Sequence, residues 1–222
     1  MRLLPTALAL LLAGSCALGS LLRWEKEAAS RPPGLLSVPP SAALHLGAMG
    51  YRSMLADALY LRFVGYWGHQ LTHGRNFHNL FPILSAIVEL DPRFLSAYQM
   101  GALALGDAGE PLKAVELLEK GAAHQPKNWF FPYQAGMTLF FFHDDYLLAA
   151  KYFERAAALP GAPPEAGYFA ARMYEKGQRT ELALATWKAI YLGTDNPSVK
   201  EIAKRALAIH GISPPESNPS PH

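Results

Sequence analysis

The fold is decided most clearly by residues 129–160, which read WFFPYQAGMTLFFFHDDYLLAAKYFERAAALP. Two apolar segments are separated by a polar turn around Asp144, and the stretch closes on Pro160. In the second segment small and apolar residues recur at i, i+4 and i+7, the stripe of one helix face: Ala149, Phe153 and Ala156. The stretch therefore predicts two helices joined by a turn.

Three series of residues repeat at nearly the same distance along the chain. Prolines that follow helix-like patterns lie 34 residues apart: Pro92, Pro126 and Pro160. Residues early in the second helix of each pair are spaced 34, 35 and 34: Leu80, Ala114, Ala149 and Ala183. In the first helix of each pair, glycines are spaced 33 and 35 residues apart: Gly68, Gly101 and Gly136. Ala170 stands where the next glycine of this series would fall. A fixed period of this size predicts an array in which each helix pair buries its apolar face against its neighbours.

These series resemble the tetratricopeptide repeat (TPR) family, whose unit has a small residue where two helices touch, an alanine early in the second helix and a closing proline. The resemblance covers about residues 54–196. It implies an all-α, right-handed solenoid of about four helix hairpins. Within a repeat region at 51–196, the units fall at about 61–94, 95–128, 129–162 and 163–196.

The helical pattern also predicts the elements one by one. First helices are expected at about 54–71, 93–107, 129–142 and 164–176, and second helices at about 78–89, 111–123, 146–158 and 180–192. A capping helix within 197–211 is expected to turn its charged residues outward: Lys200, Glu201, Lys204 and Arg205. Residues 212–222 are rich in proline and serine, which predicts a disordered tail.

The N-terminal residues 1–23 contain an uncharged run, 3–22, that is long enough for a helix crossing a bilayer. Four interpretations remain: a single-pass membrane anchor, a cleavable secretory signal, a lipoprotein signal with lipid on Cys16, and a buried helix of the soluble domain. The first three direct the repeats to or across a membrane. The expected location is therefore membrane-anchored or exported, with the repeats on the periplasmic or outer side of a bacterial inner membrane.

Residues 24–50 are expected to form a proline-rich linker. Four prolines within 31–41 disfavour a helix and favour an extended, semi-rigid spacer: Pro32, Pro33, Pro39 and Pro40. The alternative is that the part containing Leu35, Leu36 and Val38 packs on the first repeat.

Composition narrows the classes of function. The chain has 222 residues, half of them apolar, which is enough to bury one domain core. Its net charge is +2 and it has no basic stripe, which argues against nucleic acid as a partner. The single cysteine, Cys16, excludes an intramolecular disulfide and multi-cysteine metal motifs. No motif predicts catalysis, so we expect no enzyme activity, no cofactor and no small-molecule substrate.

One pair of histidines leaves a metal site open as an alternative. His69 and His73 are four residues apart, which places both imidazoles on one helix face, with His45 and His78 also in this half of the chain. Zinc normally needs a third protein ligand, which the helix spacing alone does not supply. We therefore expect two polar histidines near a helix end rather than a metal centre.

Aromatic residues suggest where a partner binds. In the resembled fold the first helices line a concave groove, and counting from Gly136 and Gly101 places these residues in it: Phe130, Tyr133, Met137 and Phe140, with Leu95, Tyr98 and Ala102 from the preceding unit. An apolar groove suits an apolar helix or an extended peptide. Tyr98, Tyr133 and Phe140 are the expected anchors, the alternative being that such aromatics form the core between repeats.

The expected function is a non-catalytic interaction scaffold or assembly factor at the bacterial cell envelope, with a protein or peptide partner. Two alternatives remain: a structural subunit of a larger membrane complex, and a metal-binding protein that uses the histidine cluster.

Overall fold

The structure, a computed structural model, describes residues 50–73, 77 and 80–213. These residues form nine helices and no strand, which confirms the all-α class for the described part of the chain. Every helix predicted between residues 50 and 213 is present, with each end within two residues of the prediction. The predictions made for residues 1–49 and 214–222 lie outside the described residues.

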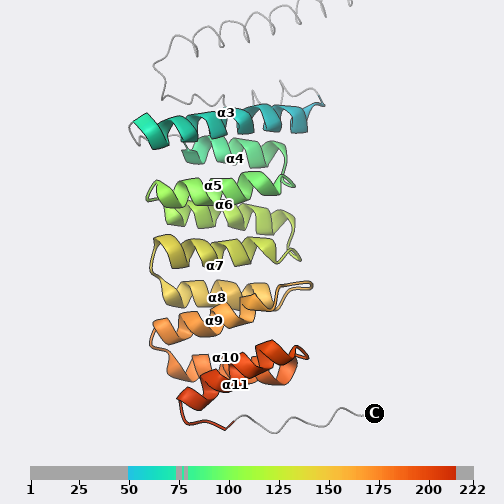
Figure 1. Cartoon of the computed structure of the whole chain (residues 1–222). Coiled ribbons are helices and arrows are strands. Elements are labelled where there is room, and N and C mark those ends of the chain that lie inside the picture. The colour runs from blue at the N-terminus through green and yellow to red at the C-terminus, as the bar shows by residue number, and fades with distance from the viewer. Residues whose placement is uncertain (1–49, 74–76, 78–79, 214–222) are drawn as a thin grey trace, which may run out of the picture. The chain divides into compact units, whose positions relative to one another are not determined.

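The helices belong to two compact units, one ending at Phe94 and the other beginning at Leu95. The first unit contains α3 (Arg52–His73) and α4 (Leu80–Leu90). The second contains seven helices, which Figure 1 shows following one another along the chain: α5 (Leu95–Asp107), α6 (Pro111–His124), α7 (Phe130–Phe142), α8 (Tyr146–Ala157), α9 (Glu165–Lys176), α10 (Thr180–Gly193) and α11 (Pro197–Ile209).

In the first unit, α3 and α4 pack on each other through residues at helical spacing. The buried apolar side chains include Ala56, Leu59 and Phe63 from α3 and Leu80, Ile83, Leu84 and Ile87 from α4. The Arg52 guanidinium donates to the Glu89 carbonyl at 3.0 Å, and the Tyr60 and Phe94 rings lie 4.8 Å apart. Both contacts hold α3 to the end of α4 and the turn after it.

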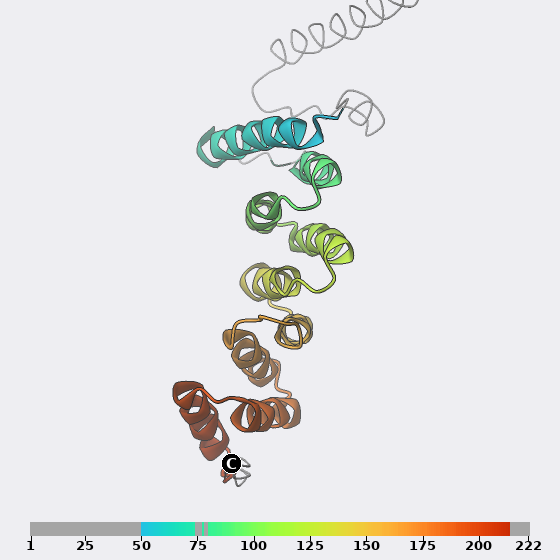
Figure 2. The same cartoon turned by 90° about the vertical axis from the view of Figure 1, so that its right-hand side faces the viewer.

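In the second unit each helix packs on the next, and α5 also contacts α7. Figure 2 shows α5 and α7 in one row and α6 and α8 in the other. The contact between α7 and α8 is close at Gly136, because a Cβ added there would lie 3.0 Å from three atoms of the Phe153 ring. Gly136 is therefore the close-contact position that the repeat pattern predicted.

The turns from first to second helices share one backbone feature. In the second unit, a residue with positive φ follows each of the helices α5, α7 and α9. These residues are Gly109 (φ of 79°), Asp144 (54°) and Gln178 (56°). After Gln178 the Arg179 N–H donates to the Tyr174 carbonyl at 2.9 Å, five residues back, which is the Schellman way of ending a helix. The repeat thus extends to the backbone conformation of its turns.

The last helix, α11, packs against α10, as expected for a cap. Its Ala203 and Leu207 are buried in one cluster with Ala171 and Trp187. Three of its four predicted outward charges are exposed: Glu201, Lys204 and Arg205. Lys200 differs, since it is half-buried with its ammonium 5.1 Å from the centre of the Tyr191 ring.

Candidate partner-binding surface

Helix α7 is apolar on both sides. Its buried side consists of Phe131, Pro132, Ala135, Gly136, Thr138 and Leu139. Its other side carries the half-buried apolar residues Phe130, Tyr133, Met137 and Phe140, which we call the α7 face, beside the half-buried Gln134. Because these four are spaced by three, four and three residues, they lie on one face of the helix. The structure therefore keeps four of the predicted groove residues together on a partly exposed surface.

The start of α7 is fixed by local bonds. The Asn128 side chain accepts from the Phe130 N–H at 3.1 Å, satisfying a donor that the helix itself leaves free. Pro132 lies in the first turn, where no backbone N–H is required. The α7 face is thus carried by a rigid element rather than by a loop.

Tyr133 lies at the centre of an aromatic cluster. Its ring meets the rings of Trp129, Phe153 and Phe169 edge-on, with centroids 5.8, 5.5 and 6.2 Å away. Burial, and to a lesser extent the negative charge of Glu165, raises the pKa of Tyr133. Its neutral ring is held by three neighbours, while part of its surface stays accessible.

Phe140, at the other end of the α7 face, is contacted by a cation. The Lys176 ammonium, from the last turn of α9, lies 5.0 Å from the centre of the Phe140 ring and 5.1 Å from that of Tyr146. Such contacts are attractive because the ring face carries partial negative charge. The next residue, Phe141, is 62% exposed and stands four residues after Met137, so it borders the α7 face.

A hollow of about 200 Å³ lies among the last three helices. It is lined by residues of α9, α10 and α11 and of the loop before α9: Pro164, Glu165, Tyr168, Trp187, Val199 and Ile202. Glu165 both lines the hollow and contributes to the raised pKa of Tyr133.

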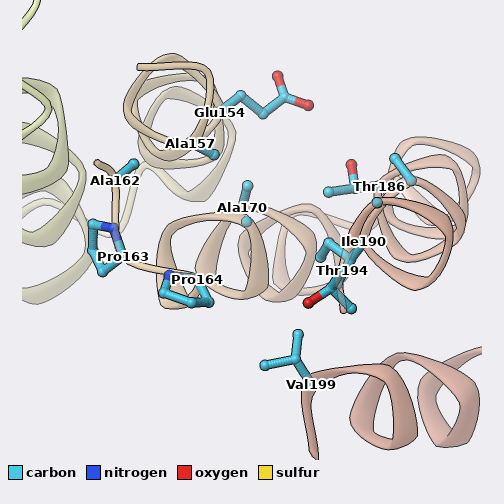
Figure 3. A pocket seen from close by; sticks show the side chains of 13 residues that line it. Glu154, Ala157, Ala162, Pro163, Pro164, Ala170, Thr186, Ile190, Thr194 and Val199 are labelled. Carbon is cyan, nitrogen blue, oxygen red and sulfur yellow. The ribbon is translucent and has the colours of Figure 1, made fainter. Parts of the chain in front are cut away.

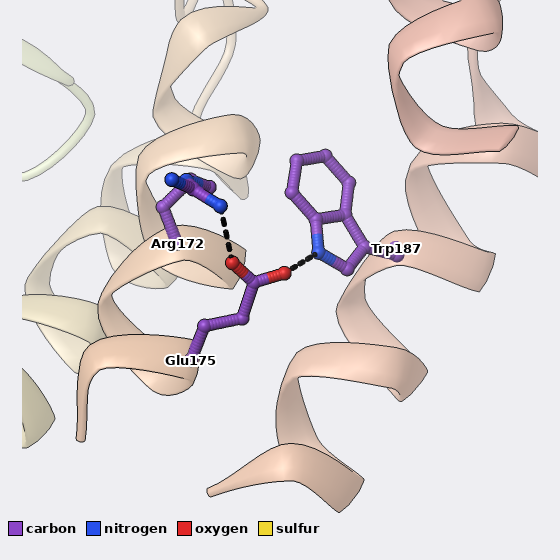
Figure 4. A network of polar contacts seen from close by, with 3 residues as sticks. All are labelled: Arg172, Glu175 and Trp187. Atoms are coloured by element: carbon purple, nitrogen blue, oxygen red, sulfur yellow. Dashed lines mark hydrogen bonds and ion pairs between the residues drawn. The ribbon is translucent and has the colours of Figure 1, made fainter. Parts of the chain in front are cut away.

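A polar network holds one wall of this hollow in place. The Trp187 Nε1–H donates to Glu175 Oε1 at 2.7 Å, and Glu175 Oε2 accepts from Arg172 at 2.6 Å (Figure 4). Trp187 is almost fully buried, and its ring lies edge-on to Tyr168 at 5.6 Å. The network therefore joins α10 to α9 and fixes the indole that lines the hollow.

The structure corrects the prediction for Tyr98. Its side chain is fully buried, and its ring lies edge-on to Phe131 at 5.0 Å. Ala102 is buried as well, while Leu95 is exposed. The prediction that Tyr98 is a partner-binding anchor is wrong, because a side chain without exposed surface belongs to the core.

The histidine pair does not have the geometry of a metal site. The His69 and His73 rings are stacked, with centroids 4.4 Å apart and planes 10° from parallel. Ring nitrogen lone pairs lie in the ring plane, so those of two stacked rings do not converge on one ion. The Nδ1 of His73 also lies 2.6 Å from the Thr72 hydroxyl. Within the described residues no group of three or more His, Cys, Asp or Glu could hold a metal, and His45 and His78 lie outside them.

Sequence reasoning missed a second hollow, of about 470 Å³, between α8, α9, α10 and the start of α11. Figure 3 shows mainly small side chains facing it, and Glu154 is the charged residue in its lining. The Glu154 carboxylate accepts from the Tyr174 hydroxyl at 2.7 Å. The signal that could have revealed it is a pair of small residues four apart on α10, Ala189 and Gly193.

Comparison with protein-family models finds no match, and comparison with curated proteins finds none either. Among the helices of the described residues, none is both long and apolar enough to cross a membrane. Function is therefore inferred from the chain's own surface.

Proposed function

We propose that this chain is a non-catalytic interaction scaffold of the TPR type that binds an apolar helix or extended peptide on the α7 face. The observation that carries the proposal is the half-exposed row Phe130, Tyr133, Met137 and Phe140. A surface helix normally turns polar residues to solvent, and apolar patches on a folded chain commonly mark binding sites.

A right-handed solenoid of about four hairpins is part of this proposal. It is supported by the helix pairs that recur about every 34 residues and by the positive φ that recurs in their turns. The close contact at Gly136 and the packing of α5 on α7 add support, because stacked hairpins bring alternate helices together.

The charges beside the α7 face narrow the chemistry of the partner. Glu165 lies at the start of α9 near Tyr133, and Lys176 lies at its end near Phe140. A partner of mainly apolar character, with a hydrogen-bond donor or cation near Tyr133 and an acceptor or anion near Phe140, matches this arrangement. Such recognition needs no cofactor and no small-molecule substrate.

The proposed place of action is the bacterial cell envelope, with the N-terminal segment directing the repeats to the membrane. Confinement to a membrane surface raises the effective concentration of any partner attached to the same membrane.

The test uses two positions on different helices. A photo-crosslinking amino acid replaces Phe140 in one variant and Leu112, which is 55% exposed on α6, in the other. We expect a discrete crosslinked protein from position 140 and none from position 112. With the partner identified, Phe140→Ala should weaken binding by about 1 kcal/mol or more, since aromatic anchors dominate interfaces, whereas Leu112→Ala should leave it unchanged.

Equal crosslinking from both positions, or loss of folding in Phe140→Ala without a selective effect on binding, would contradict the proposal. Stoichiometric co-purification of the chain from detergent with one fixed membrane complex would instead favour the structural-subunit alternative.

A further inference from the structure

The hollow of about 470 Å³ between α8, α9 and α10 carries one charged side chain, that of Glu154. Figure 3 shows this side chain extending from α8 towards the side of α10 that carries Thr186. Its carboxylate accepts from the Tyr174 hydroxyl at 2.7 Å, and among the residues that the structure describes no cation forms an ion pair with it. Since a carboxylate has two acceptor oxygens, Glu154 keeps capacity for a further donor.

The preceding repeat shows what a glutamate in this position binds. Glu119 on α6 and Glu154 on α8 each stand five residues after the alanine that recurs early in the second helices. The Glu119 carboxylate accepts from the Arg155 guanidinium of α8 at 2.6 Å. Burial, then the charge of Glu119 and a hydrogen bond to it, raise the pKa of the Tyr152 hydroxyl to about 12, while Arg155 lowers it. Glu119 therefore meets an arginine and a tyrosine of the next second helix.

The following repeat lacks both of these side chains. On α10, Ala189 stands in the position of Arg155 and Thr186 in the position of Tyr152. Both of these smaller residues line the hollow. The hollow is thus bordered by the two positions from which the preceding repeat supplies a guanidinium and a phenol ring. Glu154 is left without the cation that its counterpart has.

The ends of two helices add to the preference of this hollow for positive charge. Helix α8 ends at Ala157 and α10 at Gly193, and both residues line the hollow. The C-terminal end of a helix carries partial negative charge, which favours a cation. Helix α9 begins beside the same hollow, but Pro163 and Pro164 have no N–H to offer to an anion.

We propose that this hollow, which we call the Glu154 pocket, binds an arginine side chain of a second protein, in the manner in which Glu119 binds Arg155. Its volume is within the range of about 300–1,000 Å³ that is usual for ligand sites. The planar guanidinium matches a carboxylate better than the strongly hydrated ammonium of lysine does. The small and apolar side chains of the lining, such as Ile190 and Val199, suit the methylene stem of an arginine.

The experiment measures peptide binding to the full chain by nuclear magnetic resonance of the Ile190 and Val199 methyl groups. The probe is a short peptide with one arginine between two alanines and both ends blocked, and the matched peptide has uncharged citrulline in place of arginine. We expect saturable shifts of both methyl signals with the arginine peptide and at least about tenfold weaker binding of the citrulline peptide, since hydrogen bonds between charged groups are the stronger ones.

Three variants assign the binding to the pocket. Glu154→Gln should remove the preference for arginine over citrulline. Glu119→Gln is the matched control and should leave that preference unchanged, because Glu119 already holds Arg155. Ala189→Arg, at an exposed position, should rebuild the ion pair within the chain and weaken binding of the arginine peptide at least about tenfold. None of these residues belongs to the α7 face, so the result does not depend on the function proposed above.

Four results would overturn the proposal. The first is an unaltered chain whose Ile190 and Val199 signals do not respond to the arginine peptide, and the second is equal affinity for the citrulline peptide. The third is a preference for arginine that survives Glu154→Gln, and the fourth is tighter binding of a peptide with lysine in the central position. Circular dichroism checks the fold of each variant, and Ala189→Arg provides the decisive comparison if Glu154→Gln does not fold.

Discussion

Replacing Gly136 by alanine tests the closest contact between two helices of the second unit. The added Cβ would lie 3.0 Å from three atoms of the Phe153 ring. That ring has little room to move, since it is fully buried, stacked on Phe169 at 5.3 Å and met edge-on by Tyr133 at 5.5 Å. The substitution therefore overpacks a contact that cannot relax by moving one flexible side chain.

Two opposing effects set the size of the change in unfolding free energy. Alanine in place of glycine inside a helix stabilises by about 1 kcal/mol. Overpacking a well-packed core costs about 1–3 kcal/mol. Gly136→Ala should therefore lose about 0–2 kcal/mol, and Gly136→Leu should lose more because further carbons enter the same space.

Gly167→Ala is the control, since it makes the same change inside α9. A Cβ there would lie 3.4 Å from Ile190 Cγ1, an ordinary contact. Gly167→Ala should therefore stabilise by about 0.5–1 kcal/mol. The two alanine variants should differ by about 1–3 kcal/mol, the overpacking term alone.

Urea denaturation of the full chain, followed by circular dichroism, measures both variants. Phe153→Leu combined with Gly136→Ala completes a double-mutant cycle, in which we expect a favourable coupling of about 0.5–3 kcal/mol because the smaller side chain makes room. If Gly136→Ala stabilises as much as Gly167→Ala, the α7–α8 contact is not close and the register of the repeat is wrong.

Three further predictions concern a turn, a buried hydroxyl and an indole. Gln178→Gly should raise the unfolding free energy by about 0.5–1 kcal/mol in urea denaturation, because Gln178 sits at φ of 56°, where glycine is unstrained. Burial, then the hydrogen bond to Glu154 and the charge of Glu154, raise the pKa of Tyr174 from 10.0 to about 12. The stability that the neutral Tyr174 hydroxyl contributes is therefore complete below pH 10 and is lost as the pH rises towards 12. A pH series of urea midpoints should show that loss, and Tyr174→Phe should make it shallower. Trp187→Phe should cost about 1–3 kcal/mol in thermal or urea unfolding, since Glu175 loses the indole donor in a packed site; unchanged stability would show that the network does not join α9 to α10.

The helices were predictable because their ends are set by local chemistry. Pro111 and Pro197 each occupy a first-turn position, where proline is favoured. The side chain of Asp145 accepts from the Leu148 N–H at 2.9 Å and caps α8. These signals act within one turn of the chain, so the sequence reveals them without knowledge of the packing.

The partner-binding residues were only partly predictable, as Tyr98 and Tyr133 show. Each stands three residues before the glycine of its repeat, Gly101 or Gly136, so the sequence places them in equivalent positions. In the structure Tyr98 is fully buried, whereas Tyr133 is half-exposed. The difference depends on which side chains the neighbouring helices supply, and such contacts between distant residues are not encoded in the spacing of one repeat.

The histidine pair shows a similar limit. The spacing of His69 and His73 places both side chains on one helix face, as expected. Whether their nitrogens converge on an ion depends on side-chain rotation, and the stacked rings show that they do not.

Exposure alone is a poor guide to the residues that bind a partner. Phe141 is more exposed than Phe140, but its ring contacts its chain neighbours, Phe140 at 4.8 Å and Phe142 at 6.5 Å. Phe140 is additionally held by Lys176 from another helix, and Tyr133 by three rings. A side chain that is already held loses less rotational freedom on binding, so more of its contact free energy appears as affinity. If the affinity for the partner depended on side-chain exposure instead, Phe141→Ala would weaken binding more than Phe140→Ala.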